Sequence, residues 1–184
     1  MTTALLVIDV QNGFNDPEWG ARNNPDAETN IAALARAWQN ARDPLVLVRH
    51  DSLKADSPLR PGQPGNDLQP LLGDIRPTLL FGKDVNSAFL GEVDLDGWLR
   101  KRGIEQLVIC GIQTNMCVDT TARMGGNLGY DVTVPIDATY TFAAKGPDGT
   151  TLTAEQLATA TAVNLHGGGF ARVTITKQVL ADRA

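Results

Sequence analysis

The chain has few of the side chains that most often bind metals or form cross-links. Its 184 residues include two cysteines, Cys110 and Cys117, and two histidines, His50 and His166. The cysteines are seven positions apart, so they form neither a CxxC pair nor half of a zinc ribbon. Two histidines are too few for a histidine-rich site. The sequence therefore predicts no bound metal.

Long runs of one charge or of apolar residues are also missing. No run of Lys or Arg could follow a nucleic-acid backbone, and the formal net charge of −5 is mild. No apolar stretch approaches the roughly 20 residues that span a bilayer. The N-terminus lacks the basic start and cleavage site of a signal peptide. We expect a protein of the reducing cytoplasm, with no disulfide and no nucleic-acid or membrane partner.

Two motifs common in α/β enzymes do not occur. No G-x-G-x-x-G follows the first strand-like run, so a dinucleotide cofactor has no support, and we expect no cofactor. No G-x-S-x-G occurs either, so HGGGF, residues 166–170, is interpreted as a helix end rather than a lipase-type oxyanion loop. Without repeats or low-complexity segments, the length fits a single domain over residues 1–184.

Strand-like and helix-like segments alternate along the chain. The predicted strands are residues 4–8, 45–48, 78–81, 107–110, 130–135 and 173–175. The predicted helices begin at Asn24–Pro25, near Leu95, at Cys117, and after a capping pair formed by Thr153 and Gln156. This alternation predicts an α/β fold of three layers, α/β/α, around a six-stranded, mainly parallel, Rossmann-like sheet. Residues 52–67 and 140–152 are predicted loops.

The stretch from Leu107 to Val118 is the centre of the functional interpretation. Gly111 is expected to end its apolar strand, and Cys117 to lie in the first turn of the following helix. Free backbone N–H groups and the helix dipole stabilise an anion there, so we expect the thiol to be biased toward thiolate. The alternative is a buried cysteine that only packs.

Polar side chains follow several of the predicted strands. Asp9, His50, Lys83, Cys117 and Asp137 each come just after one. The carboxyl ends of parallel strands meet at one edge of a sheet, where ligands gather. An acid, an amine and a thiol at one edge suit nucleophilic catalysis. We expect Asp137 to serve structure alone.

Three motifs occur in a fixed order: VIDVQNGF around Asp9, GKDVNSAF around Lys83 and GIQTNMCVDTTAR around Cys117. Together they resemble the isochorismatase-like cysteine hydrolases, over nearly the whole chain. The resemblance implies the isochorismatase-like hydrolase fold and a catalytic triad of Asp9, Lys83 and Cys117. It also implies a cis peptide between Ile112 and Gln113, and an oxyanion hole made by the N–H groups of Gln113 and Cys117.

The activity implied by this resemblance is that of a cofactor-independent amidohydrolase. Its cysteine would attack a small amide, ureido, carbamoyl or lactam substrate and form a thioester, which water then cleaves. The substrate pocket is expected to include Phe14, His50, Phe89 and Asn115. Homo-oligomers are usual in this family, so we expect a dimer or tetramer, with residues 140–152 near a neighbour's pocket.

Two departures from relatives narrow the expected activity. Nicotinamidases in this family carry further metal-binding histidines after the second strand, whereas here His50 has no second histidine before His166. Isochorismatases proper cleave a vinyl ether without the cysteine, so Cys117 favours an amidase-type reaction. The alternatives that stay open are a vinyl-ether hydrolase and a non-enzymatic thiol sensor or binding protein using the same pocket.

Overall fold

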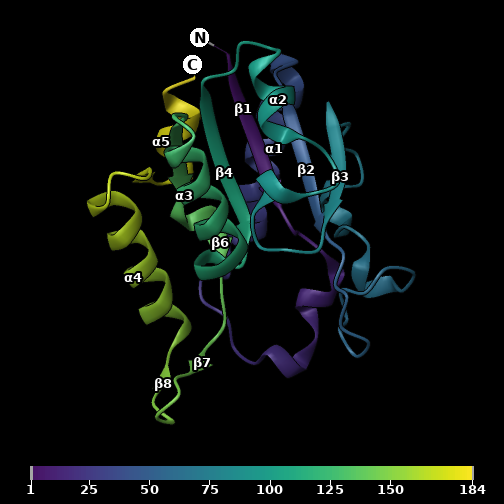
Figure 1. The fold of residues 1–184 in the computed structure, drawn as a ribbon, viewed down its shortest axis with the longest axis vertical. Helices are drawn as coiled ribbons and strands as arrows, with labels where there is room; N and C mark the ends of the chain where they lie inside the picture. The colour runs from purple at the N-terminus through teal and green to yellow at the C-terminus, as the bar shows by residue number, and fades with distance from the viewer. Residues whose placement is uncertain (1, 184) are drawn as a thin grey trace.

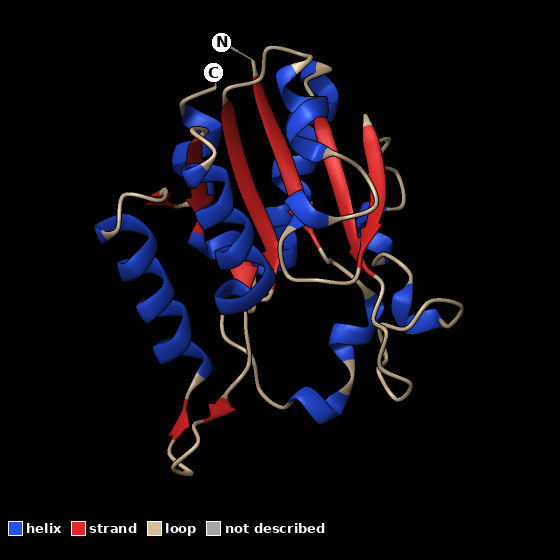
Figure 2. Cartoon of the chain, in the orientation of Figure 1, coloured by secondary structure: helices blue, strands red, loops and turns tan. Residues whose placement is uncertain are grey.

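The computed structural model describes residues 2–183 and is built around one parallel sheet (Figures 1 and 2). The strand order is β3-β2-β1-β4-β5-β9, with a short β6 paired to β4, and all neighbours are parallel. The strands are β1 Thr3–Ile8, β2 Leu45–His50, β3 Leu79–Lys83, β4 Gln106–Ile112, β5 Asp131–Pro135, β6 Thr139–Tyr140 and β9 Arg172–Thr174. The predicted parallel sheet is confirmed, and β6 is a seventh strand that the sequence did not indicate.

Helices cover both faces of the sheet. They are α1 Ala27–Ala41, α2 Leu95–Arg100, α3 Asp119–Asn127, α4 Ala154–Gly167 and α5 Thr176–Ala181. Trp38 of α1 and Val179 of α5 pack in one buried cluster with Leu5, whereas Leu6 belongs to the cluster on the opposite face. Successive residues of a strand point to opposite faces, so β1 contributes to both cores. The three predicted layers are therefore present.

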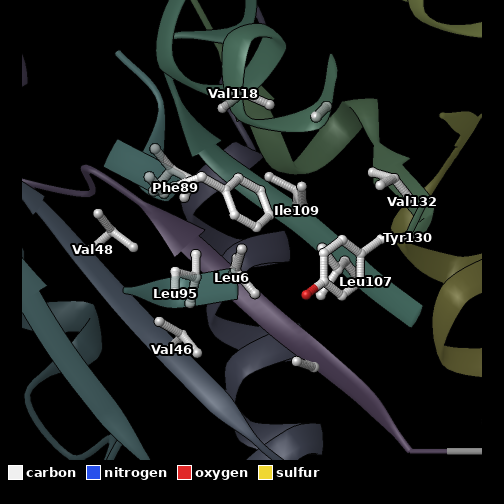
Figure 3. Packing of buried hydrophobic residues seen from close by; sticks show 14 of the residues in the cluster. Leu6, Val46, Val48, Phe89, Leu95, Leu107, Ile109, Val118, Tyr130 and Val132 are labelled. Carbon is white, nitrogen blue, oxygen red and sulfur yellow. The ribbon is translucent and has the colours of Figure 1, made fainter. Parts of the chain in front are cut away.

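The second core cluster lies between the sheet and helices α2, α3 and α4. Figure 3 shows Leu6 and Ile109 of the central strands beside Leu95 of α2 and Val118, the residue before α3. These apolar side chains are almost fully buried. The continuous apolar runs in the sequence predicted this burial, because they are typical of strands covered on both faces. This packing fixes the positions at which β1 and β4 end.

The start of α1 differs from the prediction. The helix begins at Ala27 after Asp26, not at Pro25 after an Asn24 cap. The Asn24 backbone has a φ of 46°, and its side-chain amide donates to the carbonyl oxygens of Ile136 and Thr139. The side chain of Asn24, which the local pattern assigned to helix capping, therefore forms tertiary hydrogen bonds instead. The predicted buried stripe of this helix, which includes Trp38, is present.

Gly111 does not end its strand, as the sequence suggested; β4 continues to Ile112. Gly111 has a φ of 124°, and a Cβ built there would lie 2.0 Å from the carbonyl oxygen of Ile8. Glycine is needed because β1 and β4 approach too closely for a side chain. Gly111, which the sequence suggested as the end of the strand, instead allows the close approach of two central strands.

Two further segments carry structure that the sequence did not predict. The predicted loop 140–152 contains the end of β6 and a hairpin of β7, Ala144–Lys145, and β8, Thr151–Leu152, which projects from the lower end of the molecule in Figure 1. The last strand ends at Thr174 and is followed by α5. The side chain of Asp137 accepts bonds from the backbone N–H and hydroxyl of Thr176, so the acid anchors the start of this helix.

Both termini lie at the end of the sheet where β1 begins, opposite the carboxyl ends of the central strands (Figure 1). The predicted catalytic side chains belong to those carboxyl ends. None of the helices between residues 2 and 183 combines the length and apolar character of a membrane span.

Candidate active site

Three strand ends bring the predicted triad together. Asp9 follows β1, Lys83 is the last residue of β3, and Cys117 lies in a π-helical turn, Thr114–Val118, that continues from β4 into α3. The Nζ atom of Lys83 lies 2.7 Å from Oδ2 of Asp9, and both side chains are 0% exposed. Potential ligand atoms of Asp9, His50 and Cys117 all lie within 4.8 Å of one another. His50, which the sequence placed at the same edge of the sheet, lies beside the three predicted groups.

The backbone of Asp9 adopts a conformation that is uncommon for residues other than glycine. Its φ is 53°, in the left-handed region, where aspartate is tolerated better than most residues. Two backbone bonds hold it, from Asp9 N to the oxygen of Val48 at 2.9 Å and from Gln11 N to the oxygen of Asp9 at 2.8 Å. The chain therefore turns sharply at the end of β1 and keeps the carboxylate at the sheet edge.

Burial controls the charge of the acid. Removal from water raises the pKa of Asp9 above its ordinary value of 3.8, while the charge and hydrogen bond of Lys83 oppose the rise. Its Oδ1 atom has no hydrogen-bond partner among the described residues, although the other oxygen accepts from Lys83. An acid with a raised pKa and a free buried oxygen is a good proton acceptor.

The state of Cys117 corrects the expectation of a thiolate. Burial, followed by the nearby charge of Asp9, raises the pKa of Cys117 to about 12, so the thiol is protonated at neutral pH. The helix-start argument was wrong because a π-helical turn packed in the core desolvates the sulfur, which is 8% exposed. Its proton must therefore pass to a neighbouring base during any reaction. Its Sγ donates weakly to Oδ1 of Asn86 at 3.8 Å.

The peptide bond between Ile112 and Gln113 is cis, at the position that the family resemblance implied. The turn that follows is fixed by side-chain bonds to the segment after β5. Thr114 donates to the hydroxyl of Thr139 at 2.9 Å, and Thr141 donates to the side-chain oxygen of Asn115 at 2.5 Å. These contacts hold the nucleophile turn against β6. The backbone N–H groups assigned to the oxyanion hole remain a prediction.

The predicted pocket residues have different surroundings. Phe89 belongs to the core, where its ring stacks on Tyr130 (Figure 3). Phe14 is buried against Trp19, with ring centroids 5.4 Å apart. The side chain of Asn115 is half-buried and accepts a bond from Thr141.

Of the four predicted pocket residues, His50 lines a cavity of about 390 Å³. Its other lining residues are Asp16, Glu18, Trp19, Ser52, Lys54, Asp56, Ser57 and Pro58. The sequence analysis did not identify Trp19 at this cavity, although an aromatic side chain in the loop after the first strand is a signal for a pocket residue. It also did not identify Asn86 beside the thiol, where the signal is an amide three positions after Lys83.

Asp9, His50 and Cys117 offer an oxygen, a nitrogen and a sulfur that could approach a metal ion. The Lys83 ammonium already lies 2.7 Å from the carboxylate and 3.4 Å from Nδ1 of His50. A cation in this place would meet that positive charge at close range. The residues therefore fit a metal poorly, and a metal-free site remains our prediction.

Comparisons with known proteins identify the family of this chain. Residues 3–165 match the family model described as an isochorismatase domain. The uncharacterized isochorismatase family protein YrdC of Bacillus subtilis is 34% identical, over 97% of this chain and 95% of its own. Ureidoacrylate amidohydrolase RutB of Caulobacter vibrioides is 46% identical over 80% of this chain and 59% of its own.

A solved structure is also similar to this chain in both fold and sequence. The crystal structure of an isochorismatase-family hydrolase from Chromobacterium violaceum superposes with a TM-score of 0.91 at 38% identity, covering 98% of this chain and 92% of that one. Fold and sequence together define a hydrolase of the isochorismatase-like type. The chain belongs to the isochorismatase family.

Proposed function

We propose that this chain is a cofactor-independent cysteine amidohydrolase, which cleaves a C–N bond in a small amide, ureido, carbamoyl or lactam substrate. The observation that supports it is the fully buried pair of Asp9 and Lys83 at 2.7 Å, with the Cys117 sulfur within 4.8 Å of the carboxylate. A buried acid beside a protonated thiol provides both a base and a nucleophile. The similarity to a ureidoacrylate amidohydrolase supports C–N hydrolysis in particular.

In the first half of the proposed reaction, Asp9 accepts the thiol proton as Sγ of Cys117 attacks the substrate carbonyl. Lys83 stabilises the negative charge that moves from the carboxylate to the sulfur. The backbone N–H groups of Gln113 and Cys117 donate to the carbonyl oxygen as it becomes negative. The protonated Asp9 then gives its proton to the leaving nitrogen, the C–N bond breaks, and a thioester remains.

In the second half, water attacks the thioester carbonyl and loses a proton to Asp9. The C–S bond breaks, an acid product leaves, and the proton returns to the sulfur of Cys117. The raised pKa values of both groups suit this cycle, because Asp9 first passes the thiol proton to the leaving nitrogen and then passes a proton from water to the sulfur.

Two alternative functions make different demands on Cys117. A thiol sensor needs an accessible thiolate, and the pKa of about 12 disfavours one. A vinyl-ether hydrolase needs an acid to protonate the substrate but no sulfur nucleophile. It would therefore keep its activity when Cys117 is replaced by alanine.

The test is release of ammonia or amine from a panel of nicotinamide, ureidoacrylate, carbamoyl-amino acids, maleamate and a cyclic lactam. Cys117→Ala is the inactive variant, and Cys110→Ala is the control for a second buried cysteine. Turnover that survives only in the wild type and the control supports the proposal. Turnover that survives in Cys117→Ala contradicts it.

The remaining expectations concern the surroundings of the enzyme. We propose a homo-oligomer, a small-molecule substrate, no nucleic-acid partner and a place in the reducing cytoplasm. The projecting β7–β8 hairpin supports a contact between subunits, because its four strand residues are exposed. Light scattering of the wild type against a chain lacking the hairpin tip, residues 146–149, tests the oligomer.

A further inference from the structure

One side chain that contacts the triad also lines a cavity. His50 lines this cavity of about 390 Å³ and also contacts Lys83. Trp19 forms part of its wall. Its ring stacks on Phe142 and contacts the tilted ring of Phe14, and its indole N–H donates to the oxygen of Gly13. Asp9, Lys83 and Cys117 do not line this cavity, so His50 is the side chain that connects it to the triad.

The contact with Lys83 sets the tautomer of His50. An ammonium group has only donors, so Nδ1 of His50, 3.4 Å from Nζ, is the acceptor in this pair. Burial, followed by the charge of Lys83, lowers the pKa of His50, so the ring is neutral at pH 7. A neutral ring that accepts at Nδ1 carries its hydrogen on Nε2. His50 is therefore a donor at its second nitrogen.

The backbone of His50 is held in place by a buried amide. The Gln11 side chain accepts from His50 N at 2.8 Å and donates to His50 O at 3.0 Å. A second amide, Asn66, donates to the same oxygen at 3.1 Å. Three bonds from two buried side chains fix the backbone of this residue, and the contact of Nδ1 with Lys83 orients its ring.

The charges around the cavity are mostly negative. Its lining includes the carboxylates of Asp16, Glu18 and Asp56, against the single ammonium of Lys54. None of these three carboxylates forms an ion pair with another residue between 2 and 183. A substrate carboxylate in the cavity would be repelled, whereas an uncharged acceptor would not.

We propose that the Nε2–H of His50 binds a second carbonyl oxygen of the substrate, and that the preferred substrates are uncharged amides with such a carbonyl rather than amides with a free carboxylate. This specificity rests on the proposed amidohydrolase function. It places diamides, imides and ureides ahead of half-amides of dicarboxylic acids.

The test compares three amides that differ at one end: succinamide with an uncharged carbonyl, succinamate with a carboxylate, and butyramide with neither. In the wild type we expect kcat/KM for succinamide to exceed both others by roughly tenfold, the size of one hydrogen bond. His50→Leu should reduce the succinamide-to-butyramide ratio to about one. His50→Gln, which keeps an N–H donor, should retain most of it. His166→Leu, at the exposed second histidine on α4, is the control and should leave both ratios unchanged.

The combined variant Asp16→Asn, Glu18→Gln and Asp56→Asn tests the repulsion. It should bring the ratio of kcat/KM for succinamate to kcat/KM for succinamide closer to one. A wild type that prefers succinamate, or a His50→Leu variant that keeps the wild-type ratios, would overturn the inference.

Binding to Cys117→Ala, measured by calorimetry, separates this inference from the proposed function, because it needs no turnover. Tighter binding of succinamide than of succinamate and butyramide, lost with an added His50→Leu, supports the specificity even if no amide is cleaved. Equal binding of all three overturns it, even if another amide is cleaved in a Cys117-dependent reaction.

Discussion

The two cysteines of this protein lie in adjacent segments and have opposite surroundings. Cys110 is in the middle of β4, fully buried, and belongs to the apolar cluster that contains Leu5 and Trp38. Cys117 is in the π-helical turn at the end of the same strand, beside Asp9 and His50. Burial raises the pKa of both thiols. Only Cys117 has a carboxylate that can take its proton.

The comparison shows that exposure and thiol pKa alone do not identify a nucleophile. Both cysteines would be classed as inert by these two measures. The difference is made by Asp9, which follows β1, and by His50 and Lys83, which end β2 and β3. The parallel sheet brings these side chains to the end of β4 and not to its middle. Four predictions sharpen or break this contrast, beginning with the largest effect.

Replacing each cysteine by alanine should separate their roles most clearly. We expect Cys117→Ala to lower kcat by at least about 10³-fold, because the covalent step is lost. Cys110→Ala should keep kcat within about twofold, since its sulfur touches no reacting group. Steady-state amide hydrolysis measures both. Comparable losses of kcat in the two variants would show that the two cysteines do not differ in function.

Two aspartates after strands provide the next comparison. Asp9→Asn should lower kcat by about 10² to 10⁴-fold, because the thiol loses its proton acceptor. Asp137→Asn should instead leave kcat nearly unchanged and lower the thermal midpoint, since Asp137 anchors Thr176 at the start of α5. Activity assays and thermal unfolding of both variants test this. An active Asp9→Asn enzyme would remove the base from the mechanism.

Alkylation by iodoacetamide compares the two thiols directly. At pH 8 the raised pKa of about 12 should make Cys117 react roughly 10²-fold more slowly than a free thiol, with a rate that rises as the pH increases. Cys110 should not react while the protein is folded. Peptide mass spectrometry after timed labelling distinguishes them. Rapid labelling of Cys117 at neutral pH would show that the resting sulfur is a thiolate after all.

The pH dependence of activity should reflect Asp9. The carboxylate must be ionised to accept the thiol proton, so kcat/KM falls about tenfold per pH unit below its pKa. Because burial raises that pKa above 3.8, the loss should begin at a higher pH than for an exposed aspartate. Cys110→Ala should show the same acid limb. Activity that stays flat down to pH 4 would contradict the raised pKa.

Much of the fold followed from local patterns. Apolar runs located the six main strands, because strands buried on both faces need continuous apolar residues. The capping pair of Thr153 and Gln156 is present at the start of α4. The start of α1 and the role of Gly111 were predicted wrongly, since contacts distant in sequence decided them.

The sequence by itself determined the order of strands and helices and the positions of Asp9, Lys83 and Cys117 just after or at strand ends. Motifs and hydrophobic periodicity are local properties of the chain, so they can be identified without a structure. The tertiary structure decided that Lys83 meets Asp9 at 2.7 Å, that Nδ1 of His50 lies 3.4 Å from Lys83, and that burial raises the pKa of Cys117. These properties depend on desolvation and on charges from separate strands, and no single stretch of sequence contains both.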